Sequence, residues 1–393
     1  MKKLSQKCKY LKEALTLRIN ERAHQLKKEG KNVFCFSIGE PDFNTPDFIK
    51  EKGIEAIKEN FTKYTPGAGI KQLREAISKD IQERLGIYYK PEEIVVTVGG
   101  KFAIASAILA ICDKGEEVLI PAPFFPSYIE MVHIAGGIPK LIKLKESDGF
   151  VLKPEALEKA ITKKTKGLVL NSPHNPTGAV YSKTELYEIS KIALKKDIFI
   201  ISDEVYSQLL FDGLKHTSIA SFKETFNRTF LIDSFSKTYS MTGWRIGFCA
   251  APIKLSKAIS SIQSHMNSST SSISQYASLY ALKMEKDKIN NMVKSFESRR
   301  NIMIEELKKI PEVAFITPKG AFYIFLNVKN YLKRNKSSFD LSYYLIEKKG
   351  VATMPGSAFG MEGYIRLSFA ISEEDIIRGV KKLKEGLNCF LDS

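Results

Sequence analysis

The alternation of short apolar runs with helical patterns between residues 94 and 250 constrains the fold more than any other feature of this chain. The apolar runs, which we interpret as buried strands, are residues 94–98, 118–120, 138–144, 167–170, 198–201, 229–232 and 246–250. Helical patterns separate most of them, as at 102–112, 154–161 and 183–195. Apolar strands that alternate with helices indicate an α/β domain with a largely parallel sheet.

The pattern changes after about residue 282. Charged helical segments (287–309 and 340–349) alternate there with short half-polar strands (321–327 and 364–370), which predicts a smaller α+β domain. Near the start, residues 4–26 have the apolar spacing of an amphipathic helix. We therefore expect a large domain over 46–282 and a smaller, discontinuous domain made of 1–45 and 283–393.

Composition narrows the classes of protein that this chain can belong to. Apolar residues make up 44% and charged residues 26%, which is typical of a globular protein and excludes a disordered one. The five cysteines never occur at C-x-x-C spacing, so we expect neither a disulfide framework nor a metal site, and we expect a reducing compartment, the cytoplasm. No apolar stretch is long enough to span a bilayer, and a net charge of +16 without a basic run predicts neither a membrane nor a nucleic-acid partner.

Polar residues follow several of the predicted strands, at the sheet edge where open α/β sheets bind ligands. Gly100 and Lys101 come after 94–98 and before a helix, a position that suits an anion or a plain tight turn. Asn175 lies in a segment of turn formers after 167–170. Asp203 follows 198–201 and is a candidate functional carboxylate or a helix N-cap.

Lys237 follows the strand predicted at 229–232. Hydroxyl residues surround it, and Arg245 lies eight residues further on. Most lysines are simply solvated. A lysine that acts as a Schiff-base nucleophile, however, needs such a desolvated place near other cations, because both lower its pKa.

The segment Ser234-Phe-Ser-Lys237, with Gly243-Trp-Arg245-Ile-Gly after it, closely resembles the cofactor-lysine signature of class I aminotransferases. These are pyridoxal-phosphate (PLP) enzymes of fold type I. Further motifs stand in the family's order: Gly39-Glu-Pro-Asp-Phe, Tyr64-Thr-Pro-x-Ala-Gly, Asn175-Pro-Thr-Gly, Ser202-Asp203-Glu-x-Tyr206 and Arg366-Leu-Ser. The resemblance covers nearly the whole chain and is greatest to the bacterial subgroup 1b aspartate and aspartate/prephenate enzymes.

The resemblance implies a role for each cofactor residue. Lys237 would form the Schiff base with PLP, and an ionised Asp203 would keep the pyridine nitrogen protonated. Tyr206 and Asn175 would contact the phenolic oxygen of the ring. The phosphate would lie against Ser234, Arg245 and the amides of Gly100 and Lys101. Tyr64 would reach the phosphate of a second subunit, which implies a homodimer with shared active sites.

The resemblance also implies the substrate contacts. Arg366 would bind the α-carboxylate, with Gly39 closing over it; strand alternation alone fits a solvated arginine equally well. Lys101 would meet an acidic side chain, or only neutralise the phosphate, and Lys12 would lie near prephenate. Phe125 stands where aspartate enzymes usually have tryptophan; it can stack on the cofactor ring, but it lacks an indole N–H.

We therefore expect a PLP-dependent aminotransferase that moves the amino group of aspartate to 2-oxoglutarate by a ping-pong mechanism, with prephenate to arogenate as a second candidate reaction. The alternatives are an aminotransferase for aromatic or other amino acids and a fold-type-I β-lyase, which yields pyruvate and ammonia. A PLP-sensing DNA-binding regulator is a third alternative, motivated by the charge, but the segment before Gly39 is too short for its DNA-binding domain.

Overall fold

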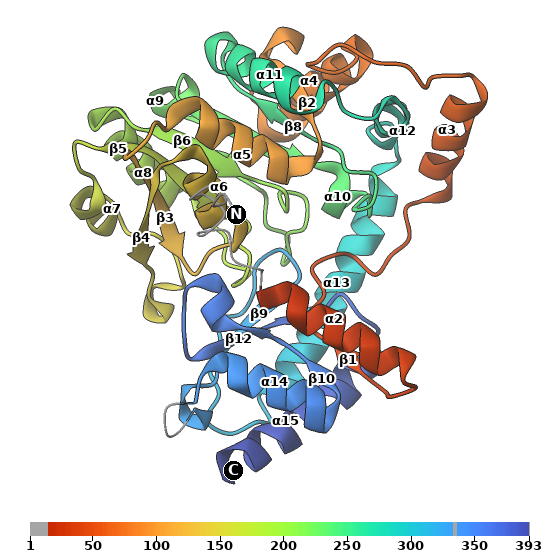
Figure 1. The fold of residues 1–393 in the computed structure, drawn as a ribbon, viewed down its shortest axis with the longest axis vertical. Coiled ribbons are helices and arrows are strands. Elements are labelled where there is room, and N and C mark those ends of the chain that lie inside the picture. The colour runs from red at the N-terminus through yellow and green to blue at the C-terminus, as the bar shows by residue number, and fades with distance from the viewer. Residues whose placement is uncertain (1–14, 333–335, 393) are drawn as a thin grey trace, which may run out of the picture.

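The computed structural model describes residues 15–332 and 336–392 (Figure 1). Its α-helices are α2 (Leu15–Lys28), α3 (Asp47–Lys58), α4 (Lys71–Leu85), α5 (Gly99–Ile111), α6 (Ser127–Ala135), α7 (Pro154–Ala160), α8 (Lys183–Lys195), α9 (Lys223–Phe226), α10 (Phe235–Thr238), α11 (Ile253–Asn267), α12 (Ser272–Ala281), α13 (Lys286–Leu307), α14 (Ser338–Lys349) and α15 (Glu373–Asp392). Its strands are β1 (Phe34–Cys35), β2 (Ile94–Thr97), β3 (Glu117–Ala122), β4 (Ile138–Lys143), β5 (Thr165–Asn171), β6 (Phe199–Asp203), β7 (Thr229–Ser234), β8 (Gly247–Ala250), β9 (Tyr323–Asn327), β10 (Val351–Ala352), β11 (Met354–Pro355) and β12 (Tyr364–Ser368).

The predicted α/β architecture is confirmed. Seven strands form one sheet in the order β2-β8-β7-β6-β5-β3-β4, and only β8 runs antiparallel to its neighbours. Residues 138–144 contain a strand, but the expectation that it is buried is wrong: β4 is an edge strand with the single neighbour β3, and most of its residues are exposed or half-buried. Ile138 and Leu141 of β4 are accordingly about half exposed.

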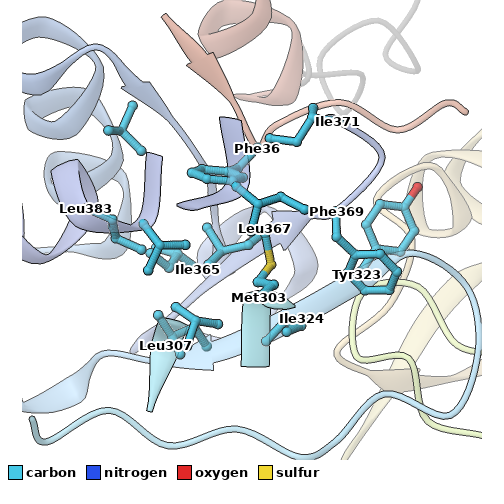
Figure 2. Packing of buried hydrophobic residues seen from close by; sticks show 14 of the residues in the cluster. Phe36, Met303, Leu307, Tyr323, Ile324, Ile365, Leu367, Phe369, Ile371 and Leu383 are labelled. Carbon is cyan, nitrogen blue, oxygen red and sulfur yellow. The ribbon is translucent and has the colours of Figure 1, made fainter. Parts of the chain in front are cut away.

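A second sheet of three antiparallel strands, β11-β12-β9, lies below the first in Figure 1. The sequence suggested that these strands have one polar, solvent-exposed face. The structure differs, because hydrophobic clusters cover both faces of the sheet. Ile324 and Leu367 pack into one hydrophobic cluster, shown in Figure 2, whereas Phe325 and Tyr364 pack into another. Every residue of β12, Arg366 included, is therefore buried.

The N-terminal segment packs on the part of the chain that carries this second sheet. Helix α2 confirms the helix predicted over 4–26 from residue 15 onward, and residues 1–14 lie outside the described residues. Arg22 of α2 forms an ion pair with Glu347 of α14, and β1 pairs in parallel with β10. We propose the division expected from the sequence, 46–282 against 1–45 with 283–393, and these contacts support it.

The loop after β6 packs against the second sheet. Tyr206, Leu209 and Phe211 belong to the same apolar cluster as Phe322 and Tyr323 of the second part. The carboxyl ends of β6 and β7 therefore face the smaller sheet across a packed interface, which encloses the candidate site. Among residues 15–332 and 336–392, no helix combines the length and apolar character needed to cross a membrane.

Candidate active site

A cavity of about 820 Å³ lies where the ends of β6 and β7 and the start of α5 meet the second sheet. The predicted site residues that line it are Gly39, Gly100, Lys101, Phe125, Asn175, Asp203, Tyr206, Ser234, Lys237, Arg245 and Arg366. Tyr64 is not among the lining residues and is 91% exposed. Lys12 lies outside the described residues. The fold thus brings together residues that are up to 327 positions apart in the chain (Gly39 to Arg366).

Lys237 supplies the amine of the cavity. It lies in the short helix α10, directly after β7, and its Nζ donates a hydrogen bond to the carbonyl of Gly39. Burial lowers the pKa of Lys237 to about 8; Glu40 opposes this shift, whereas Arg366 and Arg245 add to it. About one tenth of amines with such a pKa are neutral one pH unit below it, so this lysine can act as a nucleophile or a base near neutral pH.

Asp203 supplies a buried carboxylate at the end of β6. Its Oδ2 accepts a hydrogen bond from the Tyr128 hydroxyl and its Oδ1 accepts one from the amide of Val205 at 3.4 Å. Burial raises the pKa of Asp203 to about 6. The residues after it form a turn and not a helix, so the N-cap alternative is wrong. A cationic group bound in the cavity would stabilise the charged form of this buried carboxylate.

The start of α5 and the β7–α10 turn form a place for an anion. Helix α5 begins at Gly99, so the first amides of this 13-residue helix have no partner within the helix. The Arg245 guanidinium packs so closely that a Cβ on Gly99 would lie 2.8 Å from its Nη2. The hydroxyls of Ser234 and Ser236 lie 2.9 Å apart and both residues line the cavity. Amides, hydroxyls and a guanidinium are the donors that phosphate prefers.

Arg366 is a second anion-binding group. It is only 5% exposed, which rules out the solvated alternative, and hydrophobic clusters cover both faces of β12, the strand that carries it. Its Nη1 donates to Asn175 Oδ1 at 3.1 Å and its Nη2 donates to the Ser37 carbonyl at 2.9 Å. Its Nε is buried and has no hydrogen-bond partner among the described residues. A buried guanidinium with a spare donor and no carboxylate partner favours an anionic ligand.

Phe125 and Lys101 form the side of the cavity near α5. The Lys101 Nζ lies 5.3 Å from the centroid of the Phe125 ring, and Phe125 meets Tyr128 edge to face at 5.6 Å. Burial lowers the pKa of Lys101, and Arg245 lowers it further. A cation beside another cation creates a local positive potential, which attracts anions.

Three further residues contribute to the site that the sequence did not single out. Tyr128 donates to Asp203 from a position 75 residues away in the chain, and Tyr323 bonds the Tyr206 hydroxyl at 2.9 Å across the interface between the two sheets. No local pattern marks such long-range contacts. Ser236 is different, because its place beside Lys237 in a run of hydroxyl residues was a usable signal.

The cavity therefore combines an amine of lowered pKa, a buried carboxylate and two separate anion-binding groups. Comparison with known proteins agrees with this chemistry. The sequence model of the family "Aminotransferase class I and II" matches residues 31–383. The chain is 44% identical to a probable aspartate/prephenate aminotransferase of Aquifex aeolicus, over 98% of this chain and 99% of that one. It is 38% identical to an aspartate aminotransferase of Geobacillus stearothermophilus, over 97% and 98% of the two chains.

Solved structures agree as well. The aspartate aminotransferase of Thermus thermophilus with maleate has a TM-score of 0.93 at 35% identity, over 98% of this chain and all of that one. The match of the family's sequence model and the likeness to full-length relatives reach across both sheets and the cavity between them. The chain belongs to the class I and II aminotransferase family.

Proposed function

We propose that this chain is a PLP-dependent aminotransferase that moves the amino group of aspartate to 2-oxoglutarate and back, in a ping-pong sequence. The observation that carries this proposal is the cavity itself, whose lining combines Lys237 with an anion-binding helix start, the buried carboxylate of Asp203 and the buried guanidinium of Arg366. The names of the relatives from Aquifex and Geobacillus point to the same reaction.

The residues of the cavity fit PLP. Its phosphate suits the amides at Gly100 and Lys101, the hydroxyl of Ser234 and the guanidinium of Arg245, whose Nη2 would lie 2.8 Å from a Cβ on Gly99. The aromatic face of Phe125 suits the ring, and Asp203 suits a protonated ring nitrogen, because a facing cation lowers the pKa that burial raises. Tyr206 and Asn175 suit the phenolic oxygen.

Bound PLP supplies an electron sink for the electrons left when a proton leaves the substrate Cα. The chain's own residues do the rest. Lys237 would hold the cofactor, and its amine, once released by the substrate amine, would carry the proton from the substrate Cα to C4′ of the cofactor, which its pKa of about 8 permits. Arg366 fixes the α-carboxylate and thereby the direction of the Cα–H bond.

A dicarboxylate substrate is the best match to the charges. Arg366 accounts for one carboxylate, and Lys101 is the candidate for the other, since burial of an unpaired carboxylate is costly. The Thermus structure contains maleate, itself a dicarboxylate. Prephenate, with two carboxylates, is a second candidate amino acceptor, supported by the name of the Aquifex relative.

We further propose a homodimer with shared sites. Tyr64 is large, aromatic and 91% exposed, which is the expected state of a side chain that completes the site of a second copy.

A panel of amino donors and acceptors tests the proposed reaction. With PLP present, we expect aspartate and 2-oxoglutarate to give oxaloacetate and glutamate, and aromatic donors to react more slowly. Release of pyruvate and ammonia without use of an oxo acid would identify a β-lyase instead. Activity with aromatic donors only would indicate that Phe125, which lacks the indole N–H, has changed the substrate preference.

A further inference from the structure

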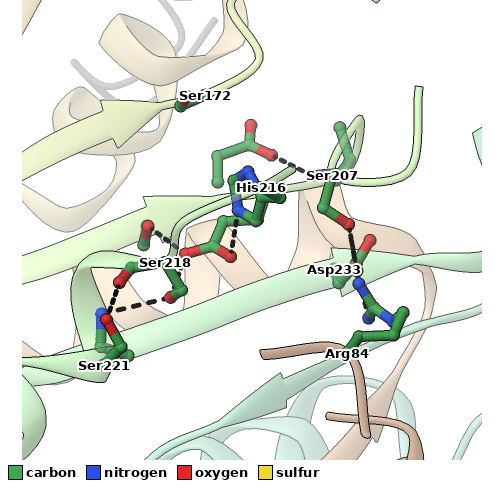
Figure 3. A network of polar contacts seen from close by, with 12 residues as sticks. Arg84, Ser172, Ser207, His216, Ser218, Ser221 and Asp233 are labelled. Carbon is green, nitrogen blue, oxygen red and sulfur yellow. Dashed lines mark hydrogen bonds and ion pairs between the residues drawn. The ribbon is translucent and has the colours of Figure 1, made fainter. Parts of the chain in front are cut away.

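A second set of buried polar side chains lies behind the cavity, at the same strand ends. Three of its members are chain neighbours of cavity residues: Glu204 follows Asp203, Ser207 follows Tyr206, and Asp233 precedes Ser234. None of the three lines the cavity. Asp233 and Ser234 are neighbours within β7, and neighbouring residues of a strand point to opposite sides. Glu204, Asp233 and Ser207 thus lie beside cavity residues in the chain without lining the cavity. Figure 3 shows the network, with Ser218 and His216 in one part and Ser207, Asp233 and Arg84 in the other.

The two parts differ in how their charge is balanced. Asp233 has a permanent cation beside it, because Arg84 Nη2 lies 3.2 Å from its Oδ2. Glu204 has only His216, whose Nε2 lies 2.7 Å from its Oε2, and the side chains are 2% and 5% exposed. No lysine or arginine within the described ranges pairs with Glu204. Among the described residues, the ring that bonds to the Glu204 carboxylate is therefore the imidazole of His216.

Glu204 is also held by hydroxyls from both sides. Ser202 and Ser218 donate to its Oε1 at 2.7 and 2.6 Å. His216 and Ser218 lie in the segment between β6 and β7, 12 and 14 residues after Glu204, so these bonds fold that segment back onto the end of β6. The same loop carries Tyr206.

The charge of Glu204 reaches the cavity. It contributes to the raised pKa of Asp203, although burial contributes more and the Tyr128 hydrogen bond opposes the shift. Without the imidazole, the Glu204 carboxylate would lose this hydrogen bond and remain a buried charge directly behind Asp203, and such charges are poorly screened in the interior.

We propose that His216 is a positioning residue for this site. Its bond to Glu204 fixes the end of β6, so that Asp203 and Tyr206 face the cavity, and it offsets the negative charge behind Asp203. The inference rests on the proposed function, because the group that Asp203 and Tyr206 face is the PLP ring. The imidazole itself does not touch that ring.

Binding of PLP to the cofactor-free protein tests the proposal, followed by absorbance and independently of turnover. His216→Leu removes the partner of Glu204, whereas His216→Gln keeps an N–H that can donate to it. Asp212→Asn is the control, since it breaks a different ion pair, between the half-exposed Asp212 and the buried Arg300 (4% exposed), and neither residue lines the cavity. The melting temperature of each variant is measured in parallel, without cofactor.

We expect His216→Leu to raise the dissociation constant for PLP by about ten-fold or more, the size seen when a group that orients a ligand-binding side chain is removed. His216→Gln should recover most of the affinity, and Asp212→Asn should lower the melting temperature but leave PLP binding within about two-fold. If His216→Leu lowers the melting temperature as Asp212→Asn does and binds PLP like the wild type, the pair is only structural and the proposal is wrong.

A second variant and the wild-type measurement allow the test to decide even if His216→Leu does not fold. Should His216→Leu fail to fold, Ser218→Ala removes a smaller contact to the same carboxylate, and unchanged PLP binding in that variant would overturn the proposal. If the wild-type chain itself binds no PLP, the proposed function fails, which is a different result from normal binding in both wild type and variants.

Discussion

Lys101 is the residue on which a preference for dicarboxylates depends. In the part of the chain that the structure describes, no carboxylate pairs with Lys101. The charged neighbour that acts on its pKa is the cation Arg245, which lowers it. Its ammonium lies beside the Phe125 ring, at the position proposed to face the substrate side chain. The substitution Lys101→Met removes the charge and keeps most of the length of the side chain.

The expected loss follows from the contact. A hydrogen bond to a charged group contributes about 1.5–3 kcal/mol, which corresponds to a factor of about 10–150 in kcat/KM. Lys101 remains partly exposed to solvent, and screening places the expectation at the lower end. We expect kcat/KM for aspartate to fall about ten-fold and kcat/KM for an uncharged aromatic donor to change by less than about three-fold.

The assay compares kcat/KM for both donors at one saturating acceptor concentration. Lys71→Met, an exposed lysine of α4 beside Glu75, controls for the change of net charge. Equal losses for both donors in Lys101→Met would mean that the lysine serves the cofactor phosphate, and the dicarboxylate argument would then be refuted.

Four further expectations follow from the site. Lys237→Ala removes both the cofactor anchor and the proton carrier, so steady-state transamination should disappear; substantial turnover would contradict the role of this lysine. Asp203→Asn should lower kcat for aspartate by a larger factor than it raises KM, and a wild-type kcat would show that the carboxylate is dispensable. The raised pKa of Asp203, about 6, also means that the folded, cofactor-free chain holds a proton that the unfolded chain has lost above pH of about 4. The free energy of unfolding should therefore fall between those pH values, by up to about 3 kcal/mol, and Asp203→Asn should flatten this fall in denaturant titrations; an unchanged slope would contradict the shift. Tyr64→Ala mixed with Lys237→Ala under conditions of subunit exchange should regain activity, whereas a fully active monomer would contradict shared sites.

The sheet and most of its helices could be predicted because their signals are local. Runs such as 198–201 and 229–232 are apolar along their length, and the structure has β6 and β7 there. The environment of a strand was harder to predict. Residues 138–144 include Lys140 and Lys143 among apolar residues, and β4 there lies at an edge of the sheet. The order of the strands depends on pairing between distant segments.

Some residues of the site could likewise be predicted from local sequence, and others could not. The position of Lys237 after a buried strand, and its motif, were readable from the sequence. The burial of Arg366 was not, because it arises when a second hydrophobic cluster covers the face of β12 that pattern alone leaves polar. The contact of Tyr128 with Asp203 and the pairing of His216 with Glu204 likewise exist only after folding.

The most direct test of the central claim is to locate the covalently bound cofactor. The full chain is incubated with PLP, reduced with borohydride, digested and analysed by mass spectrometry. The structure predicts one phosphopyridoxyl group, on the peptide that contains Lys237, and its loss when aspartate is added before reduction. A label on Lys101 or on surface lysines instead, or no label at all, would contradict the assignment of Lys237 as the cofactor lysine.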